Sequence, residues 1–168
     1  IRFTSGLLNL APLTGLSEYG GGALSSLAPN ADISQLYIRS GTLYVGTRAQ
    51  SLFINGGGVG GSWINPSYLG ATDYPHITAF EKTGANLMMG SQGGGVAEVT
   101  SGIQQKSVGM YAQYITALAQ HPSDGNYVAA ATKGGGIFLS TDGGSSWSAK
   151  HDGLSTDPRA RNVRSLAF

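Results

Sequence analysis

The chain of 168 residues contains no cysteine, which excludes disulfide bonds and thiolate metal sites. Charged residues make up only 11% of the chain, well below the roughly 25% of an average soluble domain. The net charge is +1, and no basic run indicates nucleic acid or a membrane surface. No apolar run approaches the roughly 18 residues that span a bilayer. We therefore expect neither a nucleic-acid partner nor a membrane span.

Glycine, in contrast, is abundant. It accounts for 27 of the 168 residues, about twice its usual share of roughly 7%. Hydrophobic residues make up 40%, which is enough for a core and argues against disorder. Low charge and many glycines are typical of an all-β protein with many turns. Because the first residue is Ile1 rather than Met, we expect a processed product or a part of a longer chain.

The sequence repeats itself at intervals of about 40 to 50 residues. Three segments that align with one another begin at Ile33, Ile77 and Ile115, and a fourth start at Val163 runs to the end of the chain. Each of the three opens with a short apolar strand, turns through Gly or Ser, and enters a second strand. The second strand ends at a short loop, and a third strand follows it. We expect fourth strands near Trp63, Val108 and Trp147.

Small residues mark the second strands of these repeats. Gly46, Gly90 and Ala130 fall at places that we take as equivalent. Side chains of this size would allow neighbouring sheets to approach closely. The pattern therefore predicts sheets that stack on one another.

Four short strands per repeat match the period of a β-propeller blade. We predict an all-β fold, a partial β-propeller of four-stranded antiparallel blades, with about three full blades plus remnants at both ends. A β-sandwich whose hairpins are similar by accident is the alternative. The predicted units are a degenerate first blade or arm (1–32), three blades (33–76, 77–114 and 115–162) and the first strand of a further blade (163–168).

The stretch "STDGGSSW" matches the pattern S-x-D-x-G-x-x-W at Ser140, Asp142, Gly144 and Trp147. With its surroundings, from Ile115 to the chain end, it resembles the Asp-box (BNR) repeat of secreted bacterial propellers. Sialidases, sortilin-type receptor domains, xyloglucanase-like glycosidases and Ycf48-like assembly factors share this pattern. The resemblance implies a secreted, extracellular or periplasmic, protein of bacterial type.

The chemistry of this stretch favours a structural clamp. Asp142 can accept hydrogen bonds from backbone N–H groups that follow it. Gly143 and Gly144 permit a positive φ, and Trp147 can bury a large ring over the turn. A direct role in binding a ligand is the alternative.

No residue can be assigned to catalysis. The acids Glu81, Glu98, Asp73 and Asp124 form no recognisable pair of the kind that glycoside hydrolysis needs. The histidines and arginines are equally uninformative: His76, His121 and His151 lack metal-ligand spacing, and Arg159, Arg161 and Arg164 form either a solvated loop or an anion clamp. We therefore expect no metal and no cofactor.

Aromatic residues gather near the expected fourth strands and the loops after them. They could stack on sugars or pack against another protein, and packing between blades is the alternative. The candidates for surface binding are Trp63, Tyr68, Tyr74, Tyr111 and Tyr114.

These observations favour a non-catalytic extracellular propeller module for protein or glycan binding, or for assembly. One alternative is a fragment of a sialidase-like or xyloglucanase-like glycoside hydrolase whose catalytic residues lie outside this chain. Another is a structural subunit of a larger assembly or fibre. Known propellers use about four to eight blades, so we expect further blades or a protein partner to complete the ring. Carbohydrate is a further candidate partner.

Overall fold

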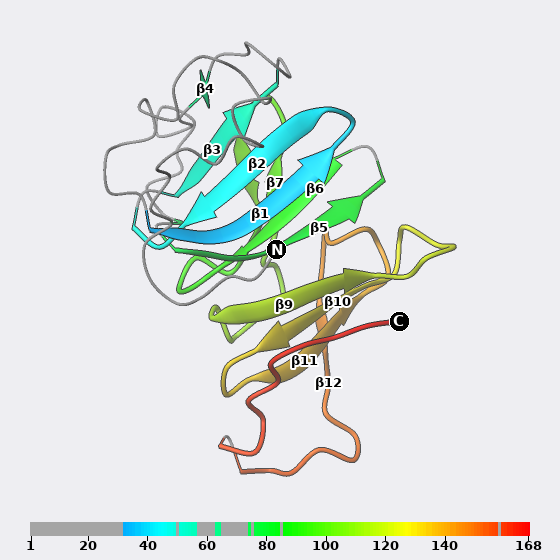
Figure 1. Cartoon of the computed structure of the whole chain (residues 1–168). Coiled ribbons are helices and arrows are strands. Elements are labelled where there is room, and N and C mark those ends of the chain that lie inside the picture. The colour runs from blue at the N-terminus through cyan, green and yellow to red at the C-terminus, as the bar shows by residue number, and fades with distance from the viewer. Residues whose placement is uncertain are drawn as a thin grey trace.

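The structure is a computed structural model, and it describes residues 32–49, 51–56, 63–64, 74, 76–84, 86–157 and 159–168. These residues form three four-stranded antiparallel sheets. The strands of each sheet follow the chain order, so each sheet is a meander (Figure 1). The predicted fold class, a partial β-propeller of about three blades, is confirmed.

The bounds of the strands repeat from sheet to sheet. The first sheet contains β1 (Ile33–Arg39), β2 (Thr42–Thr47), β3 (Leu52–Asn55) and β4 (Trp63–Ile64). The second sheet contains β5 (Ile77–Thr83), β6 (Asn86–Ser91), β7 (Val96–Val99) and β8 (Ile103–Gln105). The third sheet contains β9 (Ile115–Gln120), β10 (Val128–Thr132), β11 (Gly136–Ser140) and β12 (Ser148–Lys150).

The three sheets share one register irregularity. In each sheet the first residue of the first strand pairs with the last residue of the second strand, and the pairing then shifts by one position. Ile33 thus pairs with Thr47, Ile77 with Ser91, and Ile115 with Thr132. This shared bulge aligns the sheets residue by residue.

The alignment corrects one sequence-based assignment. Gly46 and Gly90 are equivalent, but their counterpart in the third sheet is Ala131, which pairs with Ala117. Ala130 lies one residue earlier, opposite Leu118, and therefore on the other face of the sheet. The run of three alanines in β10 offers no difference in side chain from which the register could be read.

The two glycines explain how the sheets stack. A Cβ atom at Gly46 would lie 2.8 Å from Ile77 Cβ, and one at Gly90 would lie 2.5 Å from Ile115 Cγ2. Each glycine therefore lets the first residue of the next sheet lie directly on its backbone. The prediction that small residues allow close approach holds at both positions.

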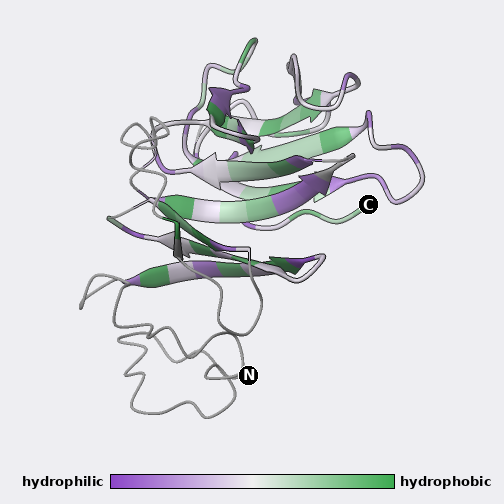
Figure 2. Ribbon diagram, turned by 90° about the horizontal axis from the view of Figure 1, so that it is seen from above, coloured by the Kyte–Doolittle hydropathy of each residue, from purple (hydrophilic) through white to green (hydrophobic). Residues whose placement is uncertain are grey.

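Apolar side chains fill the space between the sheets. Met88, Val96, Ile115 and Phe138 are fully buried in the cluster that joins the second and third sheets. Figure 2 shows that green, hydrophobic segments lie mostly in the strands and that purple, hydrophilic segments lie in the turns and in parts of several strands. A hydroxyl closes the second-to-third-strand turn of every sheet, because the side chains of Thr47, Ser91 and Thr132 each donate to a carbonyl four residues later.

One predicted fourth strand was wrong. The strand expected near Val108 lies earlier in the chain, at β8. The segment around Val108 instead turns at Gly109, with φ +87°. The carbonyl of Val108 accepts a hydrogen bond from Trp147 N. The strands expected near Trp63 and Trp147 are present as β4 and β12. The predicted arm or degenerate blade before residue 32 lies outside the described residues.

Candidate functional site

The turn from Ser140 to Trp147 joins β11 to β12 and is held by two side chains. The Asp142 carboxylate accepts hydrogen bonds from Ser146 N at 2.8 Å and from Ser146 Oγ at 2.5 Å. Ser140 Oγ donates to Asp142 Oδ1 at 2.7 Å and accepts from Gly144 N at 2.7 Å. The side chains of Asp142 and Ser140 thus satisfy several backbone N–H groups of the turn, and Gly143 N donates to Asn126 O of the β9–β10 turn at 2.9 Å.

These hydrogen bonds stabilise the charged form of the carboxylate. Bonds from the side chain and then the backbone of Ser146, followed by the bond from Ser140, lower the pKa of Asp142 from 3.8 to about 2. Hydrogen bonding to a carboxylate has this effect because the donors lose their partner when the acid is protonated. Asp142 is exposed, so its charge belongs to the surface and not to a buried site.

The glycines of the turn are required by space as well as by conformation. Gly143 and Gly144 have φ values of +68° and +90°, a region that L side chains rarely adopt. A Cβ atom at Gly144 would lie 2.1 Å from Met88 Cε of the second sheet. The turn therefore lies against the neighbouring sheet.

Trp147 makes the main contact of this turn with the second sheet. Its side chain is 5% exposed and belongs to the cluster between the sheets. Its Nε1 donates to the carbonyl of Lys106 at 2.8 Å, and its backbone N donates to Val108 O at 2.9 Å. The ring also covers its own turn, 3.6 Å from the place of a Cβ at Gly144. The tryptophan thus fastens two sheets together, which sequence reasoning had not foreseen.

The aromatic candidates for surface binding do not form one group. Tyr74 is buried, at 5% exposure, in the cluster between the first and second sheets, so its assignment to the surface was wrong. Tyr111 is 64% exposed. Tyr114 is half-buried, with Lys133 Nζ 5.1 Å from the centre of its ring. Tyr68 and the side chain of Trp63 lie outside the described residues.

Tyr111 is exposed but held in place. Its ring lies edge-on to Phe138, with centroids 4.9 Å apart, and its hydroxyl bonds His151 Nε2 and the carbonyl of Gly135. His151 Nδ1 is buried without a hydrogen-bond partner. A bare nitrogen costs less there than a buried N–H, so the arrangement favours the tautomer in which His151 Nε2 donates to Tyr111, whose hydroxyl donates to Gly135.

The acids considered for catalysis are engaged in local contacts. Glu98 accepts from Asn86 Nδ2 at 2.9 Å and pairs with Lys106 Nζ at 3.3 Å. Glu81 and Asp124 accept from backbone N–H groups one and two residues after them. Asp73 lies outside the described residues. Each described carboxylate of this set therefore stabilises its own strand or turn.

A shallow hollow of about 260 Å³ lies between the second and third sheets, beside the turn from Ser140 to Trp147. Its lining consists of three glycines, one asparagine and one acid. It is lined by Gly84, Glu98, Gly125, Asn126 and Gly143.

At the opposite end of the strands the three sheets carry equivalent side-chain pairs. In each sheet, the residue after the second strand donates its backbone N–H to the carbonyl of the residue before the first strand, at 2.9 to 3.0 Å. The side chains of these residues also pair, each in a different way. We call the six residues the paired row: Asp32 with Arg48, His76 with Gln92, and Tyr114 with Lys133.

The interactions of the paired row differ in chemistry although the backbone is the same. Arg48 Nε lies 3.3 Å from Asp32 Oδ2, an ion pair. His76 Nδ1 and Gln92 Oε1 are 2.5 Å apart, and the third pair is the cation–π contact already described. Sequence reasoning missed this row. Its signal was present in the alignment of repeats, as polar or aromatic residues directly flanking the first and second strands.

The described residues contain no group of three or more His, Asp or Glu side chains that could hold a metal ion. In the same part of the chain, no helix is long and apolar enough to cross a bilayer.

Comparison with known proteins supports the fold and gives no family. No protein-family model matches the chain, and no curated protein matches it in sequence. Among solved structures, the computationally designed Ika8 protein is similar with a TM-score of 0.56 and 19% identity, over 81% of this chain and 40% of Ika8. The designed Ika4 protein is similar with a TM-score of 0.55 and 18% identity, over 83% of this chain and 81% of Ika4.

An ancestral GH74 enzyme is also similar, with a TM-score of 0.59 and 16% identity. The likeness covers 84% of this chain but only 21% of the enzyme. The chain therefore spans two fifths of Ika8 and about a fifth of the GH74 enzyme. At these identities the likeness concerns the fold alone, which is that of a partial β-propeller.

Proposed function

We propose that this chain is part of a non-catalytic, secreted Asp-box propeller that binds a protein or glycan, or assembles with further blades. In this proposal the turn from Ser140 to Trp147 is a structural clamp between blades. The bonds of Asp142 within the turn and the burial of Trp147 against the second sheet support that role. The exposed surface at the other end of the strands would then serve recognition.

The observation that carries the assembly part of the proposal is the position of Val163. Thr116 Oγ1 donates to Val163 O at 2.5 Å, just as Ser34 Oγ donates to Ile77 O at 2.5 Å. Val163 N also donates to the carbonyl of Thr132. Val163 thus lies on the third sheet as Ile77 lies on the first. This supports the proposal that residues 163–168, which form no strand in this structure, become the first strand of a further blade when one is completed.

At the opposite end of the stack, two apolar side chains on the outer face of the first sheet are exposed. Tyr37 packs towards Phe80 of the second sheet, with ring centroids 6.1 Å apart. Because side chains alternate along a strand, Leu36 and Ile38 point the other way, and they are 36% and 56% exposed. Their cross-strand neighbours on the same face, Val45 and Leu43, are buried, so the apolar surface left for a partner at this end is that of Leu36 and Ile38.

The contacts of the acids support a role without catalysis. Glu98 is held by a lysine and an asparagine, and Asp142 by its turn. Paired-carboxylate hydrolysis needs one acid that is free to donate a proton and another that is free to attack or to activate water. Glu98 and Asp142, the two acids held in this way among the described residues, do not offer such a pair.

A glycoside-hydrolase fragment is the second candidate, and the GH74 likeness favours it. Because the chain spans 21% of that enzyme, catalytic acids could lie in residues beyond this chain. A structural subunit that packs blade on blade is a third candidate, favoured by the exposed side chains of Leu36 and Ile38 in β1.

Two measurements on the purified chain test the proposal. A panel of aryl glycosides and sialosides should show no turnover, and turnover that disappears in Glu81→Gln would overturn the non-catalytic role. Light scattering should show self-association, which Ile38→Lys should weaken and the exposed control Lys82→Gln should leave unchanged. A stable monomer with no tendency to associate would contradict the assembly part.

A further inference from the structure

The structure assigns the paired row to an acidic oligosaccharide, and this inference rests on the proposed binding function. The row is continuous across the second and third sheets, because Gln92 and Tyr114 form a β-bridge between them. It extends to the first sheet through the contact of Gly46 with Ile77, which follows His76. One end of the strands therefore presents a line of six side chains that crosses three blades.

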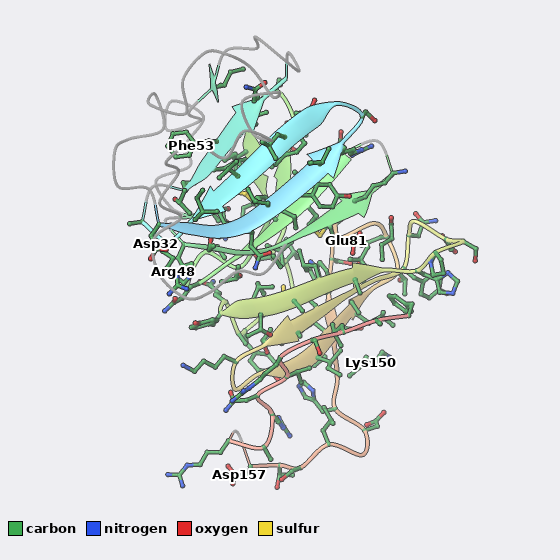
Figure 3. The ribbon with its side chains drawn as sticks, in the orientation of Figure 1. Asp32, Arg48, Phe53, Glu81, Lys150 and Asp157 are labelled. Atoms are coloured by element: carbon green, nitrogen blue, oxygen red, sulfur yellow. The ribbon has the colours of Figure 1, made fainter. Side chains whose placement is uncertain are left out.

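The exposure of the row makes it accessible. The side chains of Asp32 and Arg48 are each 59% exposed, and Gln92 and Lys133 are exposed as well. In Figure 3, Asp32 and Arg48 lie together at one end of the strands, whereas Glu81 lies towards the other end. The pairs hold these side chains in place while leaving them open to solvent, as a preorganised binding surface requires.

The charge of the row favours an anion. It contains two cations, Arg48 and Lys133, and one acid, Asp32. The next loop adds Arg161, whose backbone carbonyl accepts a hydrogen bond from Gly136 N. Within the described residues, Lys133 and Arg161 have no acid within ion-pair distance. An anion that crosses the row would meet cations from at least two blades.

The other members of the row favour a sugar as the carrier of that anion. Gln92 and His76 offer hydrogen-bond groups of both kinds, which suit hydroxyls. Tyr111, 64% exposed and fixed by its hydroxyl, lies three residues before Tyr114 of the row and offers a flat apolar surface. Aromatic faces, amides and separated cations together suit a chain of carboxylated sugar rings.

The experiment is a titration of the chain with an oligogalacturonate of defined length at low salt, by calorimetry. Its fully methyl-esterified form is the matched neutral probe, and polyglutamate is the acidic non-sugar probe. We expect binding of the oligogalacturonate only, and binding that weakens as salt rises. Binding of the neutral probe at equal strength, or of polyglutamate at equal strength, would overturn the inference.

Variants locate the site. Arg48→Gln and Lys133→Gln should each weaken binding about tenfold, as the loss of one charge-assisted hydrogen bond does. Lys82→Gln, an exposed cation at the other end of the strands, should bind as the parent chain does. Melting curves show whether each variant is folded, and equal affinity in all folded variants would refute the site.

The same titration separates this inference from the proposed function. Chromatography of the ligand afterwards should recover it intact. Cleaved ligand would overturn the non-catalytic function, whereas intact ligand without binding would overturn only the assignment of the row.

Discussion

Replacement of Trp147 by alanine should separate the second and third sheets more than any other single change at the turn. The ring is 5% exposed, lies in the cluster between the sheets and donates to Lys106 O at 2.8 Å. Truncation of such a packed aromatic ring costs about 3–5 kcal/mol. About 1 kcal/mol of this is the lost hydrogen bond. Since whole domains are stable by about 5–15 kcal/mol, the variant should be close to unfolding.

Urea unfolding followed by far-UV circular dichroism measures this loss. Fluorescence is unsuitable because the change removes one of only two tryptophans. Trp147→Phe is the matched control, since it keeps most of the apolar ring and removes the N–H donor. We expect it to cost about 1–2 kcal/mol, mainly through the carbonyl of Lys106 left without its donor.

The two variants also test the reasoning separately. A loss below about 1 kcal/mol in Trp147→Ala would show that the sheets stay joined without the ring. Equal losses in both variants would show that the hydrogen bond, and not the packing, dominates. Either result would refute the assignment of this side chain as a fastening between blades.

Three further changes probe other contacts. Asp142, whose pKa is about 2 in the folded chain, should add stability that is present above about pH 4 and is lost as the pH falls through about 2. Solvent screening at this exposed site limits that stability to about 1 kcal/mol. Urea midpoints measured from pH 2 to 7 should show this loss at low pH in the parent chain and not in Asp142→Asn. Gly90→Ala should cost about 1–3 kcal/mol because the new methyl group meets Ile115, whereas Gly102→Ala, where nothing lies within 4 Å, should unfold at nearly the parent's urea concentration. Thr132→Val should cost about 1–2 kcal/mol, because the variant lacks the buried hydroxyl that donates to the carbonyl of Gly136. An unchanged thermal midpoint would contradict this.

Much of the fold could be predicted from sequence because the repeat is written in local features. The repeat starts at Ile33, Ile77 and Ile115 are the first residues of the first strands. In each repeat a turn and a second strand follow, and the second strand ends in a threonine or serine whose hydroxyl closes the next turn. Propeller blades contact mainly their neighbours, so a repeat of local patterns is enough to specify the stack.

The contacts between strands and sheets were harder to predict. Val108 was expected in a fourth strand, but nothing in the sequence showed that its carbonyl serves Trp147 from the next sheet. The buried position of Tyr74 likewise depends on how two sheets meet. The pair of Asp32 and Arg48 joins residues whose proximity follows from the register of two strands, which a single sequence does not display.

The glycine contacts also set the distance between neighbouring sheets. In a propeller each sheet packs on the next around a central axis, so each contact of this kind is one step around that axis. Gly46 and Gly90 fix how closely each sheet meets the next. Ala131 holds the same position in the third sheet, so a methyl group defines the next step. The spacing of successive sheets in this chain is therefore set, at one equivalent position, by whether the residue carries a β-carbon.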